Sequence, residues 1–146
     1  MKNYNNLYSK INYEVTIDAV EPNEKARINL LEQNIATKIY PSIEDVETQY
    51  DLVFTSGVLI HIHPEELLNF TKNIYKLSSK YVICAEYFRP EPEVISYRGQ
   101  KNALFIRDFG SFYLDNFPLS CISFGFAWKR LTYIDNLNWF VFKKAH

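Results

Sequence analysis

The chain alternates between two spacings of apolar residues, one typical of strands and one typical of helices. The strand-like spacing predicts short β-branched and apolar strands, and a nearly continuous apolar run suggests that the third of them is covered on both faces. The helical spacing predicts amphipathic helices between the strands. The predicted strands are 15–20, 37–40, 50–56, 80–88, 120–130 and 136–145, and the predicted helices are 24–34, 64–78 and 108–117.

Capping residues and breaks support these boundaries. Asn23 follows a proline and suits the N-cap of the first helix, and Pro64 suits the first turn of the second, where His63 can act as the cap. The segment Arg89–Asp108 shows neither spacing and is predicted to be a loop. The last two strands are close together in sequence, which predicts a C-terminal antiparallel pair.

The order of elements predicts a single α/β domain over residues 1–146, with an atypical segment at 1–14. Ligands of such sheets bind beyond the carboxyl ends of parallel strands. Polar residues stand at three of these ends: Glu21, Thr55-Ser56-Gly57 and Glu86-Tyr87. They predict a ligand-binding crevice at this edge of the sheet.

Composition narrows the class of protein. Apolar residues make up 47% and charged residues 23% of the 146 positions, as in a globular protein, and the net charge of −1 gives no basic field for nucleic acid. The sequence has no apolar run long enough to cross a membrane, and "MKNYNNLYSK" lacks the apolar stretch expected of a signal peptide. Cys84 and Cys121 lie in apolar runs, which predicts two buried thiols in a reducing cytosol. We therefore expect a cytoplasmic protein with a small-molecule partner.

The segments "IDAVEPNEKA", "YDLVFTSGVLIHIHPEELL", "KYVICAEYF" and "YRG", in this order, resemble class I S-adenosylmethionine (SAM)-dependent methyltransferases. The chain looks most like the methylases associated with pseudaminic acid biosynthesis. The resemblance covers most of the chain from Val15 onward. It implies a Rossmann-like sheet, truncated at the N-terminus, and SAM as the cofactor. It also implies transfer of a methyl group to a hydroxyl of a sugar or another small metabolite.

The resemblance assigns cofactor contacts to the first half of the chain. It implies that Glu21, an acid at a strand end, accepts hydrogen bonds from the ribose hydroxyls. Ser42 and Ile43, in a short loop, would line the adenine pocket. The end of the third predicted strand, at Thr55, Ser56 and Gly57, would border the methionine and the methyl group. Glu21 could also be a plain strand-terminating acid.

The same resemblance places the chemistry and the acceptor. His61 would be the general base, with Glu86 as the second candidate, and Tyr87, Tyr97 and Arg98 would contact the acceptor. Each has a structural alternative: His61 as a packed histidine of a surface turn, and Glu86 as the ion-pair partner of Arg98. A metal site is disfavoured, because two histidines and one acid are a weak ligand set.

The sequence departs from the family in one respect. The family's first strand ends in a glycine-rich loop that approaches the cofactor, yet no glycine precedes Gly57 here. This predicts a missing central strand between 15–20 and 50–56. Residues 3–11 could fill the gap, the flanking strands could pair directly, or a second subunit could cover the exposed edge in a homo-oligomer. The alternative function is a non-catalytic binding or assembly module that has lost the SAM cradle; an enzyme acting on an unrelated small ligand has no motif behind it.

Overall fold

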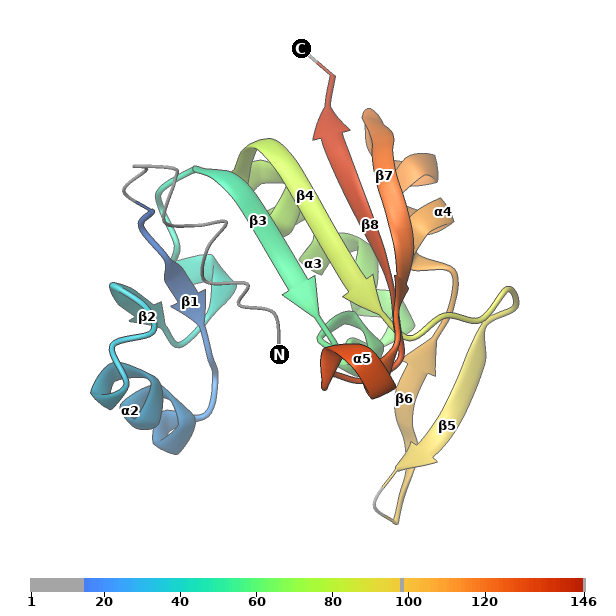
Figure 1. The fold of residues 1–146 in the computed structure, drawn as a ribbon, viewed down its shortest axis with the longest axis horizontal. Coiled ribbons are helices and arrows are strands. Elements are labelled where there is room, and N and C mark those ends of the chain that lie inside the picture. The colour runs from blue at the N-terminus through green and yellow to red at the C-terminus, as the bar shows by residue number, and fades with distance from the viewer. Residues whose placement is uncertain (1–14, 98, 146) are drawn as a thin grey trace. The chain divides into compact units, whose positions relative to one another are not determined.

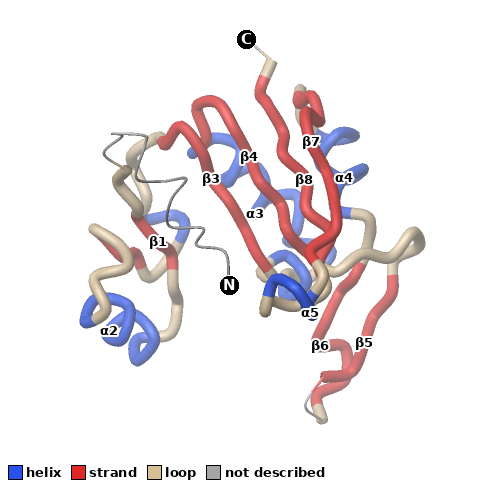
Figure 2. Tube along the Cα trace, in the orientation of Figure 1, coloured by secondary structure: helices blue, strands red, loops and turns tan. Residues whose placement is uncertain are grey.

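The computed structural model describes residues 15–97 and 99–145. Contacts divide the chain into two compact units, Met1–Val46 and Glu47–His146, which are treated separately below. Figure 1 labels the elements of both units, and Figure 2 separates helices from strands by colour. The expectation of one domain over the whole chain remains a prediction.

The first unit contains a strand–helix–strand unit with parallel strands. Its elements are β1 (Asp18–Val20), α2 (Glu24–Glu32), β2 (Lys38–Tyr40) and the 3₁₀ helix η1 (Ile43–Asp45). β1 pairs with β2 in parallel, with Ala19 opposite Ile39. The side chain of Asn23 accepts a hydrogen bond from the backbone N–H of Ala26 at 3.1 Å, so the predicted N-cap is confirmed. The unit therefore has the βαβ form that alternating patterns predict.

The second unit is built on a four-stranded sheet with the order β3-β4-β8-β7. β3 (Tyr50–Ser56) and β4 (Ser78–Glu86) are parallel, whereas β8 (Leu137–Lys144) runs antiparallel to both β4 and β7 (Leu119–Ala127). The predicted C-terminal antiparallel pair is thus confirmed. Two helices, α3 (Pro64–Leu77) and α4 (Phe109–Asn116), lie on one side of this sheet (Figure 1).

The start of α3 follows from its sequence. Pro64 occupies the first turn, and Nδ1 of His63 accepts a hydrogen bond from the backbone N–H of Glu65 at 3.4 Å. The predicted capping role of His63 is therefore confirmed. Leu67 and Ile74 on the inner face of the helix are buried, as the helical spacing predicted.

The core of the second unit lies between the sheet and the two helices. Val82 and Phe142, on the inner faces of β4 and β8, are 0% exposed, and so is Tyr113 of α4. The ring of Tyr113 lies 5.3 Å from that of Phe142, measured between centroids. Alternate residues of the strands point to this core, which explains why the side chains on one face of the sheet are buried.

The prediction of a loop over Arg89–Asp108 is wrong. The segment forms a hairpin of β5 (Glu93–Tyr97) and β6 (Gln100–Ile106), two antiparallel strands joined by a turn in which Gly99 has φ of 80°. The prolines before Glu93 mask the strand-like spacing of β5. The predicted strand 120–130 also ends early, at Ala127, because the short helix α5 (Lys129–Thr132) follows it.

Two predictions about burial are also wrong. Cys84 is buried as expected, but Cys121 is exposed, because β7 is an edge strand of the described sheet. Burial raises the pKa of the Cys84 thiol well above its usual range. Within the second unit β3 is covered on one face only: α3 packs on that face, and Leu52 and Phe54 are 40% and 61% exposed.

The predicted gap in the sheet concerns strands of different units. β1 pairs with β2 in the first unit, and β3 pairs with β4 in the second. Direct pairing of the two flanking strands therefore stays a prediction. Residues 3–11 lie outside the described part of the chain, and coverage by a second subunit stays a prediction.

We expect Phe142→Ala to lower the free energy of unfolding by about 3–5 kcal/mol, because it leaves a cavity between the sheet and α4. The matched control is Phe124→Ala on the neighbouring strand, where the ring is 74% exposed; it should cost less than about 1 kcal/mol. Urea denaturation followed by fluorescence measures both. Equal losses would contradict the assignment of the core.

Candidate functional site

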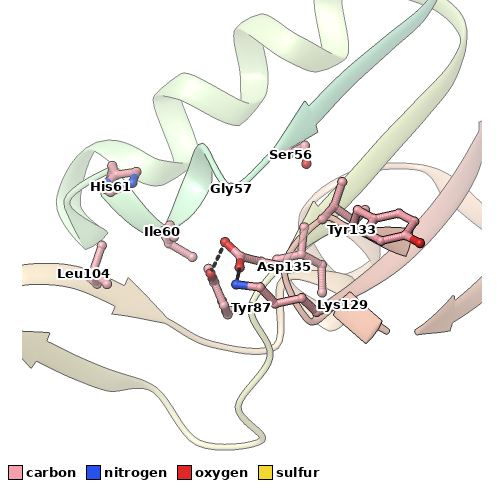
Figure 3. A pocket seen from close by; sticks show the side chains of 11 residues that line it. Ser56, Gly57, Ile60, His61, Tyr87, Leu104, Lys129, Tyr133 and Asp135 are labelled. Carbon is pink, nitrogen blue, oxygen red and sulfur yellow. Dashed lines mark hydrogen bonds and ion pairs between the residues drawn. The ribbon is translucent and has the colours of Figure 1, made fainter. Parts of the chain in front are cut away.

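The second unit contains a pocket of about 530 Å³ at the carboxyl ends of β3 and β4 (Figure 3). We call Ser56, Gly57, Ile60 and His61 the pocket floor, and Lys129, Tyr133, Ile134, Asp135 and Leu137 the pocket wall. Tyr87 and Leu104 complete the lining. The volume is within the range of small-molecule sites in proteins.

The pocket floor depends on a turn at the end of β3. Gly57 has φ of 63°, a conformation that favours glycine, and its N–H donates to the carbonyl of Ala85 at 2.9 Å. The turn leads into the 3₁₀ helix η2 (Leu59–His61). Ile60 is buried and His61 is exposed, and both line the pocket.

Glu86 lies behind this turn and outside the pocket lining. Glu86 is 2% exposed, and its Oε1 accepts hydrogen bonds from the backbone N–H groups of Val58 at 3.1 Å and Leu59 at 3.2 Å. Burial raises the pKa of this carboxyl, and the N–H groups of Leu59 and Val58 oppose that rise. The nearby Thr55 hydroxyl also lowers the pKa of Glu86. Neither the Thr55 hydroxyl oxygen nor Oε2 of Glu86 makes a well-formed hydrogen bond with any of the described residues.

The pocket wall contains a paired set of polar groups. The Tyr87 hydroxyl donates to Oδ2 of Asp135 at 2.8 Å, and Nζ of Lys129 donates to Oδ1 at 2.9 Å (Figure 3). The hydrogen bond and the charge of Lys129, together with the hydrogen bond from Tyr87, lower the pKa of Asp135. The positive charge of Lys129 and the negative charge of Asp135 therefore neutralise each other within the pocket wall. The wall offers hydrogen-bonding groups without a strong net field.

Sequence reasoning missed Lys129, Tyr133 and Asp135. Lys129 lies at the end of the predicted strand 120–130, and Tyr133 and Asp135 lie in the short connection between that strand and the predicted strand 136–145. The signal that could have found them is the density of charged and aromatic residues there. An ordinary tight turn between antiparallel strands uses small turn formers instead.

The structure brings four of the predicted site residues together: Ser56, Gly57, His61 and Tyr87 all line the pocket. Thr55 is buried directly before Ser56. Glu86 is close in sequence and space to the turn but does not line the cavity.

Other predicted residues lie elsewhere. Glu21, Ser42 and Ile43 belong to the first unit, so their part in the site stays a prediction. Oε1 of Glu21 accepts a hydrogen bond from the N–H of Asn23 at 2.7 Å, and the Ser42 hydroxyl donates to Glu44. Tyr97 ends β5; its side chain and Arg98 lie outside what the structure describes.

Two further features of the described residues bear on function. No group of three or more His, Cys, Asp or Glu side chains there could hold a metal ion. No helix in residues 15–97 and 99–145 is long and apolar enough to cross a membrane.

The mixed α/β architecture, with its antiparallel β7–β8 pair, is the Rossmann-like fold of methyltransferases. Neither a protein-family model nor a curated protein matches the sequence. Three solved structures illustrate the likeness, and at their low sequence identity it defines the fold alone.

Magnesium protoporphyrin IX methyltransferase from Synechocystis PCC 6803, with bound SAM, is 15% identical with a TM-score of 0.62, over 90% of this chain and 60% of that one. The 1,6-didemethyltoxoflavin-N1-methyltransferase of Burkholderia thailandensis, with bound 1,6-didemethyltoxoflavin and S-adenosylhomocysteine, is 11% identical with a TM-score of 0.69, over 88% and 61%. A SAM-dependent methyltransferase from Methanosarcina mazei is 12% identical with a TM-score of 0.64, over 98% and 87%. The chain thus spans about three fifths of the first two.

We expect Gly57→Ala to lower the free energy of unfolding by about 1–2 kcal/mol through backbone strain alone. An added Cβ meets nothing within 4 Å, so no clash contributes. Gly57→Asn is the matched control and should cost less, because asparagine tolerates this conformation. Denaturant titration measures the difference; equal costs would show that strain is not the cause.

Proposed function

We propose that this chain takes part in SAM-dependent methyl transfer to a small-molecule acceptor bound in the pocket of the second unit. The observation that carries the proposal is the placement of this pocket. It lies at the carboxyl ends of adjacent parallel strands, where α/β folds bind ligands, in a chain with a methyltransferase fold. The solved methyltransferases with bound SAM, S-adenosylhomocysteine or substrate support the same interpretation.

The chain's residues fit the cofactor in part. Glu21 follows β1, and its Oε1 accepts a hydrogen bond from the N–H of Asn23. In this proposal its carboxylate would accept hydrogen bonds from the ribose hydroxyls. Thr55, Ser56 and Gly57 would border the methionine end, and Ser42 with Ile43 the adenine. No glycine precedes Gly57, so the sequence contains no glycine-rich cradle for the donor's carboxylate. When bound, SAM supplies a methyl group on a positively charged sulfur.

His61 is the residue we assign as general base. It is exposed on η2 and lines the pocket, so its imidazole can reach a hydroxyl of a bound acceptor. Imidazole is the side chain best suited to accept a proton at neutral pH. The remaining contribution of the chain is alignment of the acceptor and exclusion of water.

The acceptor we propose is a sugar or a similar polyhydroxy ring, as in the methylases associated with pseudaminic acid biosynthesis. The pocket lining presents the Tyr87–Asp135–Lys129 hydrogen-bonding set, while Ile60, Leu104 and Leu137 supply apolar contacts. Such a mixture suits a ring with hydroxyls on its edge and C–H groups on its face. Tyr97 and Arg98 would contact the acceptor from the β5–β6 turn.

One observation favours a second candidate function. Because no glycine precedes Gly57, the chain could bind the acceptor without binding the donor. It would then be a non-catalytic binding or assembly module with a methyltransferase fold. The two candidates differ in one measurable property, which is affinity for the methyl donor or its demethylated product.

Calorimetry with S-adenosylhomocysteine separates these candidates. If the donor site is present, binding heat is expected, and Glu21→Ala should weaken affinity about tenfold to a hundredfold by removing the ribose contacts. Glu24→Ala, which removes an exposed acid three residues further along, is the control and should leave affinity unchanged. No heat at millimolar ligand would support the non-catalytic module.

A second experiment concerns His61. With a panel of sugar acceptors and detection by mass spectrometry, His61→Ala should lower kcat about 10²- to 10⁴-fold while donor affinity stays constant. His63→Ala is the control, because His63 caps α3 and does not line the pocket. Unchanged turnover in His61→Ala would remove this residue from the mechanism.

A further inference from the structure

We propose that Glu86 is a positioning residue: its buried carboxylate holds the turn that forms the pocket floor and thereby fixes the place of His61. This inference concerns the shape of the pocket. It holds whether the pocket serves methyl transfer or binding alone. It gives Glu86 a task other than that of a base.

Two consecutive residues at the end of β4 hold the turn. The carbonyl of Ala85 accepts from the N–H of Gly57 at 2.9 Å, and Oε1 of Glu86 accepts from Val58 and Leu59 at 3.1 and 3.2 Å. Three successive N–H groups after β3 are therefore bound to β4. The backbone of β4 accepts the first of these hydrogen bonds, and the side chain of Glu86 accepts the other two.

The turn transmits this attachment to the pocket. The N–H of His61 donates to the carbonyl of Val58 at 3.0 Å, so His61 is one hydrogen bond away from a residue that Glu86 holds. Leu59 is 0% and Ile60 3% exposed, which anchors the same segment in the core. A displacement of Val58 would change where the imidazole lies.

Burial argues against direct chemistry by Glu86. The residue is 2% exposed and absent from the pocket lining, and Oε2 is buried without a hydrogen-bond partner among the described residues. A base must reach the proton that it removes. A carboxylate below the floor can act on an acceptor only through the backbone that it holds.

Several ionisable groups lie around Glu86, but burial is the cause that raises its pKa. Cys84 of β4 and Tyr113 of α4 interact with Glu86 electrostatically, and Asp108 interacts with the Cys84 thiol. The residue opposite Glu86 on β8 is the neutral Asn138. His61 on η2 lies beyond the turn. Burial raises the pKa of Glu86. Acidification through that raised value removes the charge and weakens both hydrogen bonds, because a neutral carboxyl is the poorer acceptor.

Ionisation of Glu86 strengthens its two hydrogen bonds to the turn but lowers the stability of the whole fold. A carboxyl whose pKa is raised in the folded state costs stability when it ionises, so its contribution falls as pH rises from about the ordinary value of 4.5 through the raised value. Glu86→Gln keeps an oxygen acceptor for Val58 and Leu59 but carries no charge. Its stability relative to the wild type should therefore improve across that window, then stay level.

Amide NMR during a pH titration tests the proposal directly. In the wild type, the amide signals of Val58 and Leu59 should shift together, with a midpoint above 4.5. In Glu86→Gln that transition should vanish, whereas in Glu66→Gln, an exposed acid of α3, it should persist. The same transition in Glu86→Gln would overturn the proposal.

Hydrogen exchange supplies the second measurement. Amide exchange at Val58 and Leu59 should be about tenfold faster in Glu86→Ala than in the wild type, and the His61 ring signals should move, while Glu86→Gln stays within about threefold. Where Glu86→Ala does not fold, Glu86→Asp replaces it, since the shorter side chain loses the same contacts. Unchanged exchange would overturn the proposal. No readout uses a methyl donor, so this result and that of the calorimetry are independent.

Discussion

The parallel register of β3 and β4 is the constraint on which the candidate site depends. It sets Ser56 opposite Ala85, so the two strands end side by side. Gly57 then lies within reach of the Ala85 carbonyl, and Glu86 within reach of the next two N–H groups. A slip of one residue would move Glu86 to the exposed face and leave buried N–H groups without acceptors. The burial of a carboxylate is tolerated because this register supplies its donors.

The fold could be predicted where local sequence decides the outcome. The Asn23 and His63 caps and the antiparallel strands at the C-terminus were found because each is specified within a few residues. The β5–β6 hairpin, the exposure of Cys121 and the open face over Phe54 were not, because each depends on what packs nearby in space. Burial is a tertiary property that an apolar run alone does not determine.

The site shows the same division. Ser56, Gly57, His61 and Tyr87 follow from the rule that ligands bind beyond parallel strand ends, and the pocket contains all four. Lys129 and Asp135 come from a connection between antiparallel strands, to which that rule does not apply. The residues assigned to the donor are divided equally between the two units, whereas the pocket lies wholly in the second.

The contrast between the two cysteines has a practical consequence. Cys84 is sealed in the core next to Glu86, and its thiol resists ionisation; Cys121 is accessible on an edge strand. Because the thiolate is the reactive form, an alkylating reagent should find one modifiable sulfur on the native molecule. A fluorophore attached there would sit on the outer strand, away from the ends of β3 and β4. A slower reaction of a second equivalent of reagent, at Cys84, would then measure the rate at which the core opens, without any substitution in the chain.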